Sequence, residues 1–147
     1  MLHKVKCEKY NPQRRFIGRL PKGQDLIKSL EAFCQEQNIS IGVFSLIGAV
    51  SSAKIGAYDQ KRQIYESFQK DREFEILHCT GNISLKDSRP FVHAHIMLAD
   101  AKGQTLGGHL FSDTIIYAAE IDLQELGGPA LERSKDSATG LMLWNFT

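Results

Sequence analysis

Only one stretch of the chain has apolar residues at helical spacing, and this limits the folds that the chain can adopt. Within residues 24–37 the apolar side chains fall on one side of a helix, and they are Leu26, Ile27, Leu30, Phe33 and Cys34. From residue 39 onward the sequence consists of short apolar or alternating segments, a pattern typical of β-strands. The sequence therefore predicts an α+β fold, in which one principal α-helix packs on a bent, mainly antiparallel β-sheet.

The expected strands are short and are separated by turn-forming residues. They cover residues 3–10, 16–20, 39–49, 53–58, 63–69, 73–84, 91–99, 105–111, 115–123 and 139–146. Ser51 and Ser52 are expected to form a turn, and residues 131–137 a polar loop. Asn38 is expected to end the helix. Because no repeat or linker interrupts the pattern, residues 1–147 are predicted to form a single domain.

The composition is that of an ordinary globular protein and excludes several classes of partner. Of the 147 residues, 42% are hydrophobic and 24% charged, which is enough to bury a core without disulfides or metal. The net charge of +1 predicts no general attraction to nucleic acid or to an anionic membrane. The first 22 residues are locally basic, which fits either a solvated edge strand or an anion-facing patch.

The cysteine spacing and the hydropathy pattern bear on the compartment. Cys7, Cys34 and Cys79 are odd in number and widely spaced, so we expect reduced thiols rather than a disulfide framework. No apolar run approaches the ~20 residues of a membrane span, and the N-terminus lacks the apolar stretch of a signal peptide. We therefore expect a cytoplasmic protein with no membrane partner.

Three of the five histidines lie within seventeen residues of one another. His93 and His95 are two apart in an expected strand, so both point to the same face. A hairpin that turns near residues 101–103 places His109 opposite His95. Three imidazoles on one face are a typical ligand set for an open transition-metal site, and zinc is the expected metal. The alternative is that they are hydrogen-bonded core residues.

Several short segments of the chain resemble the PPC domain (plant and prokaryote conserved domain), in its free-standing prokaryotic form. They are Gly18-Arg19-Leu20-Pro21-Lys22-Gly23, Ile47-Gly48-Ala49-Val50, Glu73-Phe74-Glu75-Ile76-Leu77, Thr80-Gly81-Asn82-Ile83-Ser84-Leu85, Phe91-Val92-His93-Ala94-His95, Gly107-Gly108-His109-Leu110 and Thr139-Gly140-Leu141. The resemblance implies an α+β fold, a homotrimer and a structural kinship with acetolactate decarboxylase. The zinc site of that enzyme uses an HxH pair and a third downstream histidine, which match His93, His95 and His109.

A metal enzyme also needs an acid or base near the metal. Glu75 and Glu120 are the candidate catalytic residues, and Arg19 is a candidate for orienting a substrate. Glu75 lies in an apolar strand, where burial would favour its protonated, acidic form. The alternative for both glutamates is an ordinary solvent-facing strand position. Thr80 or Asn82 could orient a carboxylate or a bound water.

Two functions of different classes follow from these observations. The first is a trimeric zinc-binding protein whose pocket takes a small carboxylic acid, such as an oxo- or hydroxy-acid. The second is a non-catalytic module that binds DNA or a protein. Plant members of the family carry AT-hooks that bind DNA, but this chain has no Arg-Gly-Arg-Pro segment and no basic tail. The near-neutral charge also argues against DNA, while the basic N-terminal stretch, tripled in a trimer, favours it.

Overall fold

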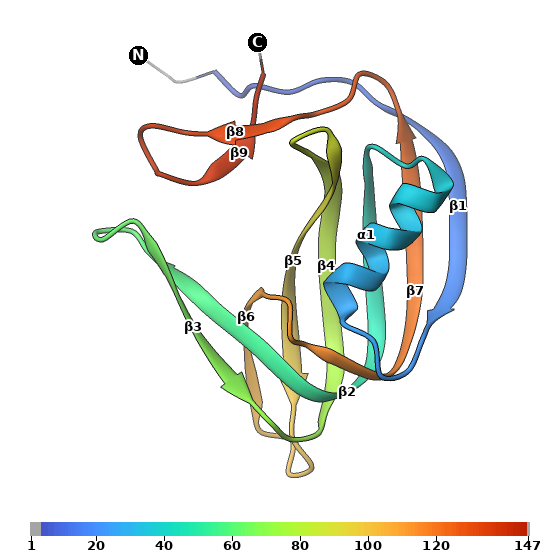
Figure 1. Cartoon of the computed structure of the whole chain (residues 1–147), viewed down its shortest axis with the longest axis vertical. Coiled ribbons are helices and arrows are strands. Elements are labelled where there is room, and N and C mark those ends of the chain that lie inside the picture. Colours follow the sequence, from blue (N-terminus) through green and yellow to red (C-terminus); the bar gives the residue numbers. More distant parts are fainter. Residues whose placement is uncertain (1–3, 147) are drawn as a thin grey trace.

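The computed structural model describes residues 4–146 and contains one helix and nine strands in that range (Figure 1). In chain order they are β1 (Asn11–Leu20), α1 (Leu26–Gln37), β2 (Gly42–Asp59), β3 (Ile64–Lys70), β4 (Phe74–Lys86), β5 (Arg89–Ala99), β6 (Thr105–Leu110), β7 (Ile115–Gly127), β8 (Arg133–Lys135) and β9 (Met142–Trp144). The predicted α+β class with one principal helix is confirmed.

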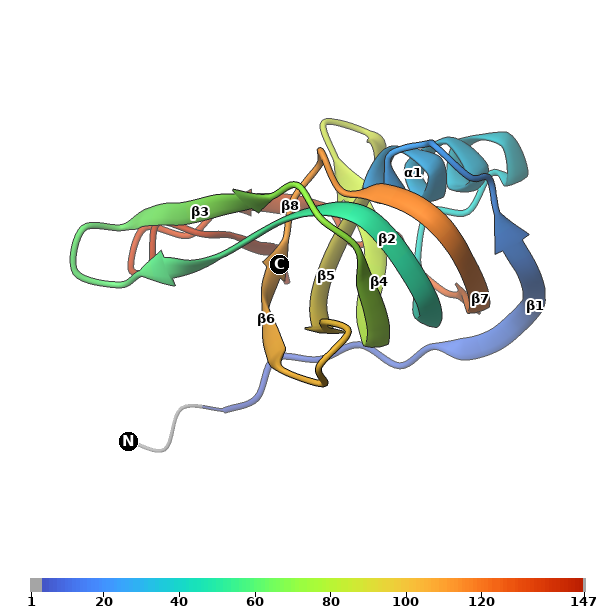
Figure 2. The same ribbon diagram turned by 90° about the horizontal axis from the view of Figure 1, so that it is seen from below.

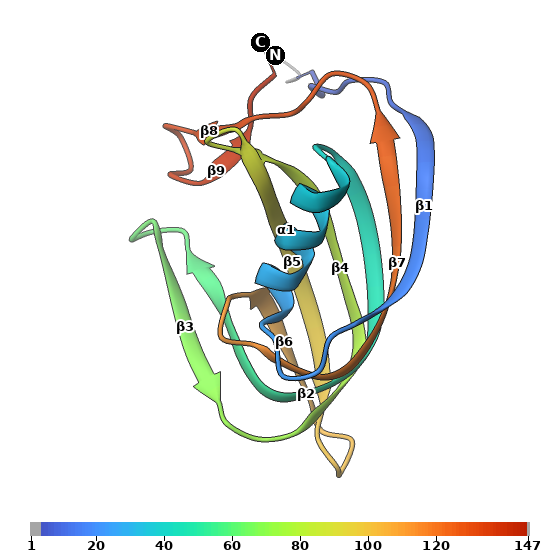
Figure 3. The same cartoon turned by 45° about the vertical axis from the view of Figure 1, so that its right-hand side comes forward.

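A curved antiparallel sheet forms the body of the molecule. Its strands follow the order β1-β7-β2-β4-β5-β6, and β3 pairs with the outer half of β2. The curvature is strong enough that β2 also pairs with β6, through Ile55 opposite Leu110 and Gly56 opposite His109. Helix α1 lies across one face of the sheet (Figure 3), and its residues Leu26, Leu30 and Cys34 are fully buried there.

The helix begins and ends as the sequence predicted, within two residues. Asp25 is the N-cap, and its side chain accepts a hydrogen bond from the Lys28 N–H. Asn38 ends the helix in the left-handed conformation, with φ of 55°. This helix has 12 residues, and no helix in residues 4–146 is long and apolar enough to cross a membrane.

The expected turn at Ser51 and Ser52 is wrong, because both residues lie within strand β2. The chain does not reverse there but continues as one strand of 18 residues. The register with β7 shifts between Ala49 and Ser52, so the two serines lie at a bulge that bends the strand. Beyond the bend, residues 53–59 of β2 and all of β3 form a two-stranded arm that projects from the sheet (Figure 2).

Two further expectations are wrong at the ends of the chain. Residues 4–10 form no strand, since the alternating pattern has no neighbouring strand to pair with, and His3 lies outside the described residues. The expected strand 139–146 is limited to β9. Its partner is β8, which lies inside the expected polar loop 131–137, and the two form a small second sheet. We call this pair the C-terminal hairpin.

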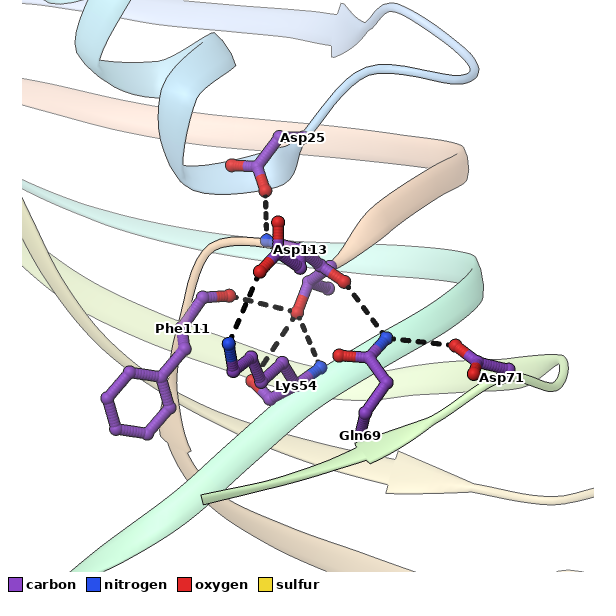
Figure 4. Close-up of polar contacts among 7 residues, drawn as sticks. Asp25, Lys54, Gln69, Asp71, Phe111 and Asp113 are labelled. Atoms are coloured by element: carbon purple, nitrogen blue, oxygen red, sulfur yellow. Dashed lines mark hydrogen bonds and ion pairs between the residues drawn. The ribbon is translucent and has the colours of Figure 1, made fainter. Parts of the chain in front are cut away.

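A network of polar side chains ties the start of α1 to the sheet and to the arm (Figure 4). The second carboxylate oxygen of Asp25 accepts the Asp113 N–H, and the Asp113 carboxylate pairs with Lys54 of β2 at 3.3 Å. The Gln69 amide of β3 donates to the Asp113 carbonyl and to Asp71. The loop between β6 and β7 is thereby fixed against three elements.

Replacing Asp25 by alanine tests this network. Asp25→Ala removes the N-cap and the acceptor for the Asp113 N–H, so we expect the free energy of unfolding to fall by about 1–2 kcal/mol. Urea denaturation followed by circular dichroism measures the change. Asp71→Ala is the matched control, because Asp71 is exposed and contacts only the rim of the network. Equal losses in the two variants would contradict the role of Asp25.

Candidate metal site and adjoining cleft

The three clustered histidines come together, as the hairpin expected near residues 101–103 predicted. They are His93, His95 and His109, and are here called the histidine trio. His95 lies directly opposite His109 in the register of β5 and β6. The ring centroids are 5.2 Å apart for His93 and His95, 5.1 Å for His93 and His109, and 5.6 Å for His95 and His109. One nitrogen from each ring lies within 4.8 Å of the others, so the trio could hold a metal ion.

The environment keeps two of these imidazoles neutral at neutral pH. Burial, together with the smaller effects of the neighbouring His93, His95 and Arg133, lowers the pKa of His109 to about 4. Burial, followed by Arg133 and His95, also lowers the pKa of His93. A neutral imidazole has a free lone pair, and this is the form that binds a metal.

An unsatisfied atom within the trio fits a metal ligand. The Nδ1 atom of His109 is buried and has no hydrogen-bond partner, and such an atom costs free energy. A tetrahedral ion with Zn–N distances of 2.0–2.1 Å requires ligand nitrogens about 3.3 Å apart. The three nitrogens lie within 4.8 Å of one another, so small shifts of the rings would bring them to this spacing, and the chemistry of the donor set fits zinc. If the histidines were instead hydrogen-bonded core residues, the Nδ1 atom of His109 should have a hydrogen-bond partner, and it has none.

Close backbone packing around two glycines positions His109. Gly108 lies so near to β2 that an added Cβ would be 2.5 Å from the Gly56 carbonyl oxygen. An added Cβ on Gly56 would be 2.0 Å from the Glu66 carbonyl oxygen of β3. This close approach brings the arm against the site, where the rings of Tyr65 and Phe111 lie 4.6 Å and 4.7 Å from that of His109.

A cleft of about 1070 Å³ adjoins the trio and is lined by His93 and His109. The arm, the edge of β5 and the C-terminal hairpin surround it, with Tyr65, Phe91 and Trp144 among the lining residues. Arg133 of β8 also lines it. The guanidinium donates to Asn82 Oδ1 at 2.7 Å, and Asn82 lies opposite His93. Local sequence patterns did not single out Arg133, because it lies in the segment that was expected to be a polar loop.

The structure does not bring the two candidate catalytic glutamates to the trio. Glu75 is exposed, so the burial that favoured an acid role is absent. It pairs with Ala99, four residues along β5 from His95, which is about 13 Å at strand spacing. Glu120 is also exposed and lies on β7, three strands from β5, or about 14 Å away. Arg19 pairs with Glu120 on that same side of the sheet.

The similarity to known proteins identifies the family. A family model described as the Plants and Prokaryotes Conserved (PCC) domain matches residues 7–127, which include the whole trio. The chain therefore belongs to the Plants and Prokaryotes Conserved domain family, and the resemblance to the PPC domain noted from its sequence is confirmed.

Solved structures from other organisms share the fold over nearly the whole chain. A metal-containing protein from Archaeoglobus fulgidus is 41% identical, with a TM-score of 0.92, and the match covers 97% of this chain and 100% of that one. A plant- and prokaryote-conserved protein from Pyrococcus horikoshii is 34% identical, with a TM-score of 0.90 and coverage of 97% and 99%. A proposed DNA-binding protein from Bacteroides thetaiotaomicron is 26% identical, with a TM-score of 0.82 and coverage of 93% and 97%.

A curated relative is much longer than this chain. The bifunctional protein GlmU of Synechococcus sp. (strain JA-3-3Ab) is 36% identical over 126 residues, which is 84% of this chain and 19% of GlmU. The chain thus spans about a fifth of the length of that relative, and the similarity concerns one segment of it.

Adding a methyl group at Gly108 tests the close packing that positions His109. Because the nearest atom is a backbone oxygen that cannot rotate away, we expect Gly108→Ala to lower the free energy of unfolding by about 1–3 kcal/mol. The control is Gly18→Ala, where the nearest atom would be 4.0 Å from the added Cβ; its effect should stay within about 0.5 kcal/mol. Wild-type stability of Gly108→Ala in urea would show that β6 and β2 are less tightly packed.

Proposed function

We propose that this chain is a cytoplasmic, homotrimeric zinc-binding protein whose cleft takes a small carboxylic acid. The observation that carries the metal assignment is the histidine trio, with the buried and unpartnered Nδ1 of His109. The similar protein from Archaeoglobus fulgidus, described as metal-containing, supports it. Two of the cysteines, Cys34 and Cys79, are buried free thiols, which fits a reducing compartment.

The proposed roles divide between the metal and the residues around it. His93, His95 and His109 would hold zinc, which when bound polarises a carbonyl or carboxylate group or activates water. The rings of Tyr65 and Phe111 cover His109 and limit the access of water to it. Catalytic roles for Glu75 and Glu120 stay predictions, since neither residue lies within reach of the trio in one chain.

Metal analysis of protein purified without an affinity tag tests the zinc site. We expect about one zinc per wild-type chain, and His95→Ala should lose most of it because two nitrogen ligands bind the ion far more weakly than three. His78→Ala is the matched control, since His78 is an exposed histidine of β4 outside the trio. A wild-type protein that stays metal-free after addition of zinc and removal of the excess would refute the assignment.

The proposed trimer is supported by the face of the sheet opposite α1, here called the outer face. Four large apolar side chains on it are exposed by 46–73%, namely Ile17 on β1, Val43 and Ile47 on β2 and Met97 on β5. Exposed apolar residues gathered on one face are typical of a protein interface. His95 lies on the same face, by the register of β5, so a partner chain on the outer face would also shield the metal site.

Analytical ultracentrifugation tests the trimer. We expect wild-type protein to sediment at about three times the chain mass of 16.5 kDa. Ile47→Glu, which places a charge on the outer face, should dissociate it, because burying an unpaired carboxylate is costly. Ala32→Glu on the exposed side of α1 should leave the trimer intact. A wild-type monomer, or an Ile47→Glu trimer as stable as wild type, would contradict the proposal.

DNA binding is the second candidate, because two of the similar structures, at 26% and 25% identity, are proposed DNA-binding proteins. The basic N-terminal stretch offers less free charge than its sequence suggests. Arg14 forms an ion pair with Glu125, and Arg15 with Asp122. Lys4, Lys6 and Lys9 remain exposed. A titration with duplex DNA at several salt concentrations distinguishes the candidates, since phosphate contacts give a steep salt dependence.

A further inference from the structure

The cleft contains a buried cation that no acidic side chain neutralises. Arg133 is only 7% exposed, and none of the ion pairs found among residues 4–146 includes it. Its guanidinium donates to three neutral acceptors: Ser84 Oγ at 2.8 Å, the Met142 carbonyl at 2.9 Å and Asn82 Oδ1 at 2.7 Å. Burying a charge without a counter-charge is costly, so this arginine is suited to an anionic ligand.

The hydrogen-bond geometry leaves room for that ligand. An arginine has five N–H donors, and three of those of Arg133 are used within the protein, one on each nitrogen. One N–H on each terminal nitrogen is left over. Two parallel N–H donors on a planar fork are the arrangement that binds a carboxylate or a phosphate.

The residues around Arg133 indicate the chemical character of the rest of the ligand. The rings of Phe91 and Trp144 lie 5.4 Å and 5.5 Å from the guanidinium carbon, and both line the cleft. Lys86 and Glu31 also line it. Since the Glu31 carboxylate accepts the Val92 N–H at 3.1 Å, a backbone group already partners it. Most of the remaining wall is apolar, with Leu141, Met142 and Phe146 beside the aromatic rings.

We propose that Arg133 binds the carboxylate of a small amphipathic organic acid, whose apolar body packs against Phe91 and Trp144. The proposal rests on the proposed function only for the end of the ligand that is remote from the carboxylate. That end lies near the histidine trio, because Asn82 accepts a hydrogen bond from Arg133 and also lies opposite His93. The carboxylate site itself requires no metal. Arg133 is thus a specificity residue that selects acids over neutral analogues.

Ligand binding at this site can be measured by intrinsic fluorescence. Trp144 is the only tryptophan, so its fluorescence responds to a ligand bound beside Arg133. The probes are acetate, 3-methylbutanoate and 4-methylpentanoate, with 4-methylpentanamide as the neutral analogue and inorganic phosphate as the other anion. We expect 4-methylpentanoate to bind at least tenfold more tightly than its amide and more tightly than phosphate. Within the acid series, affinity should rise up to about fourfold for each methylene buried.

The most specific test is a variant that places a carboxylate of the protein itself beside the Arg133 guanidinium. Asn82→Asp keeps the acceptor for the guanidinium but places a carboxylate 2.7 Å from its nitrogen, so it should reduce the affinity for 4-methylpentanoate at least tenfold without loosening the C-terminal hairpin. Asn11→Asp makes the same change in charge at an exposed position on β1, the opposite edge of the sheet, and should bind as wild type does. Arg133→Gln should abolish the preference for acid over amide, and near-UV circular dichroism checks that it stays folded.

Each result has a defined meaning. Equal affinity for acid and amide, tighter binding of phosphate, or wild-type affinity in Asn82→Asp overturns the proposal. A lack of response to every acid overturns it as well, and leaves Arg133 as a structural tie for the hairpin. The titrations are run on zinc-loaded and on chelator-treated protein. If the protein cannot hold zinc but still binds the acid, the Arg133 site is supported and the metal site is refuted. If the protein holds zinc but binds no acid, the metal site is supported and the Arg133 site is refuted.

Discussion

The close approach of β2 to β6 at Gly56 and Gly108 is the constraint on which the rest of the site depends. Strand β2 begins in the middle of the sheet, between β4 and β7, and ends in the arm, where it meets β6. It can do so because Gly108 has no side chain where β6 meets β2, and because Gly56 has none where β3 packs against β2. The crossing places Tyr65 over His109 and forms one wall of the cleft. The covered imidazole and one wall of the cleft therefore depend on the same close packing of β2, β3 and β6.

Features that depend on local spacing were predictable from the sequence. Helix α1 follows from five apolar residues on one side and a capping asparagine at its end, and the structure agrees within two residues. The trio follows from an HxH pair and a glycine-containing hairpin, whose length alone sets His95 opposite His109. In both cases the deciding interactions lie within about twenty residues of sequence, and no other part of the chain overrides them.

Features that depend on distant parts of the chain were not predictable in this way. Ser51 and Ser52 have the composition of a turn, but pairing with β7 on one side and β3 beyond keeps the chain extended through a bulge. Glu75 lies between apolar neighbours, yet strand alternation turns it to the exposed side while Phe74 and Ile76 are buried. Arg133 gains its surroundings from β4 and β9, some 50 and 10 residues away in sequence. The role proposed for Arg133 therefore follows from its position in the fold rather than from its local sequence.

The C-terminal hairpin lies outside the sheet that holds the trio, and it also lies beyond residues 7–127, the part of the chain that the family model matches. The proposed metal donors and Phe91 thus lie in the main sheet, whereas Arg133 and Trp144, which are proposed to contact the acid, lie in the hairpin. Under these proposals, a related protein with a different terminal segment would take a different ligand beside the same three histidines.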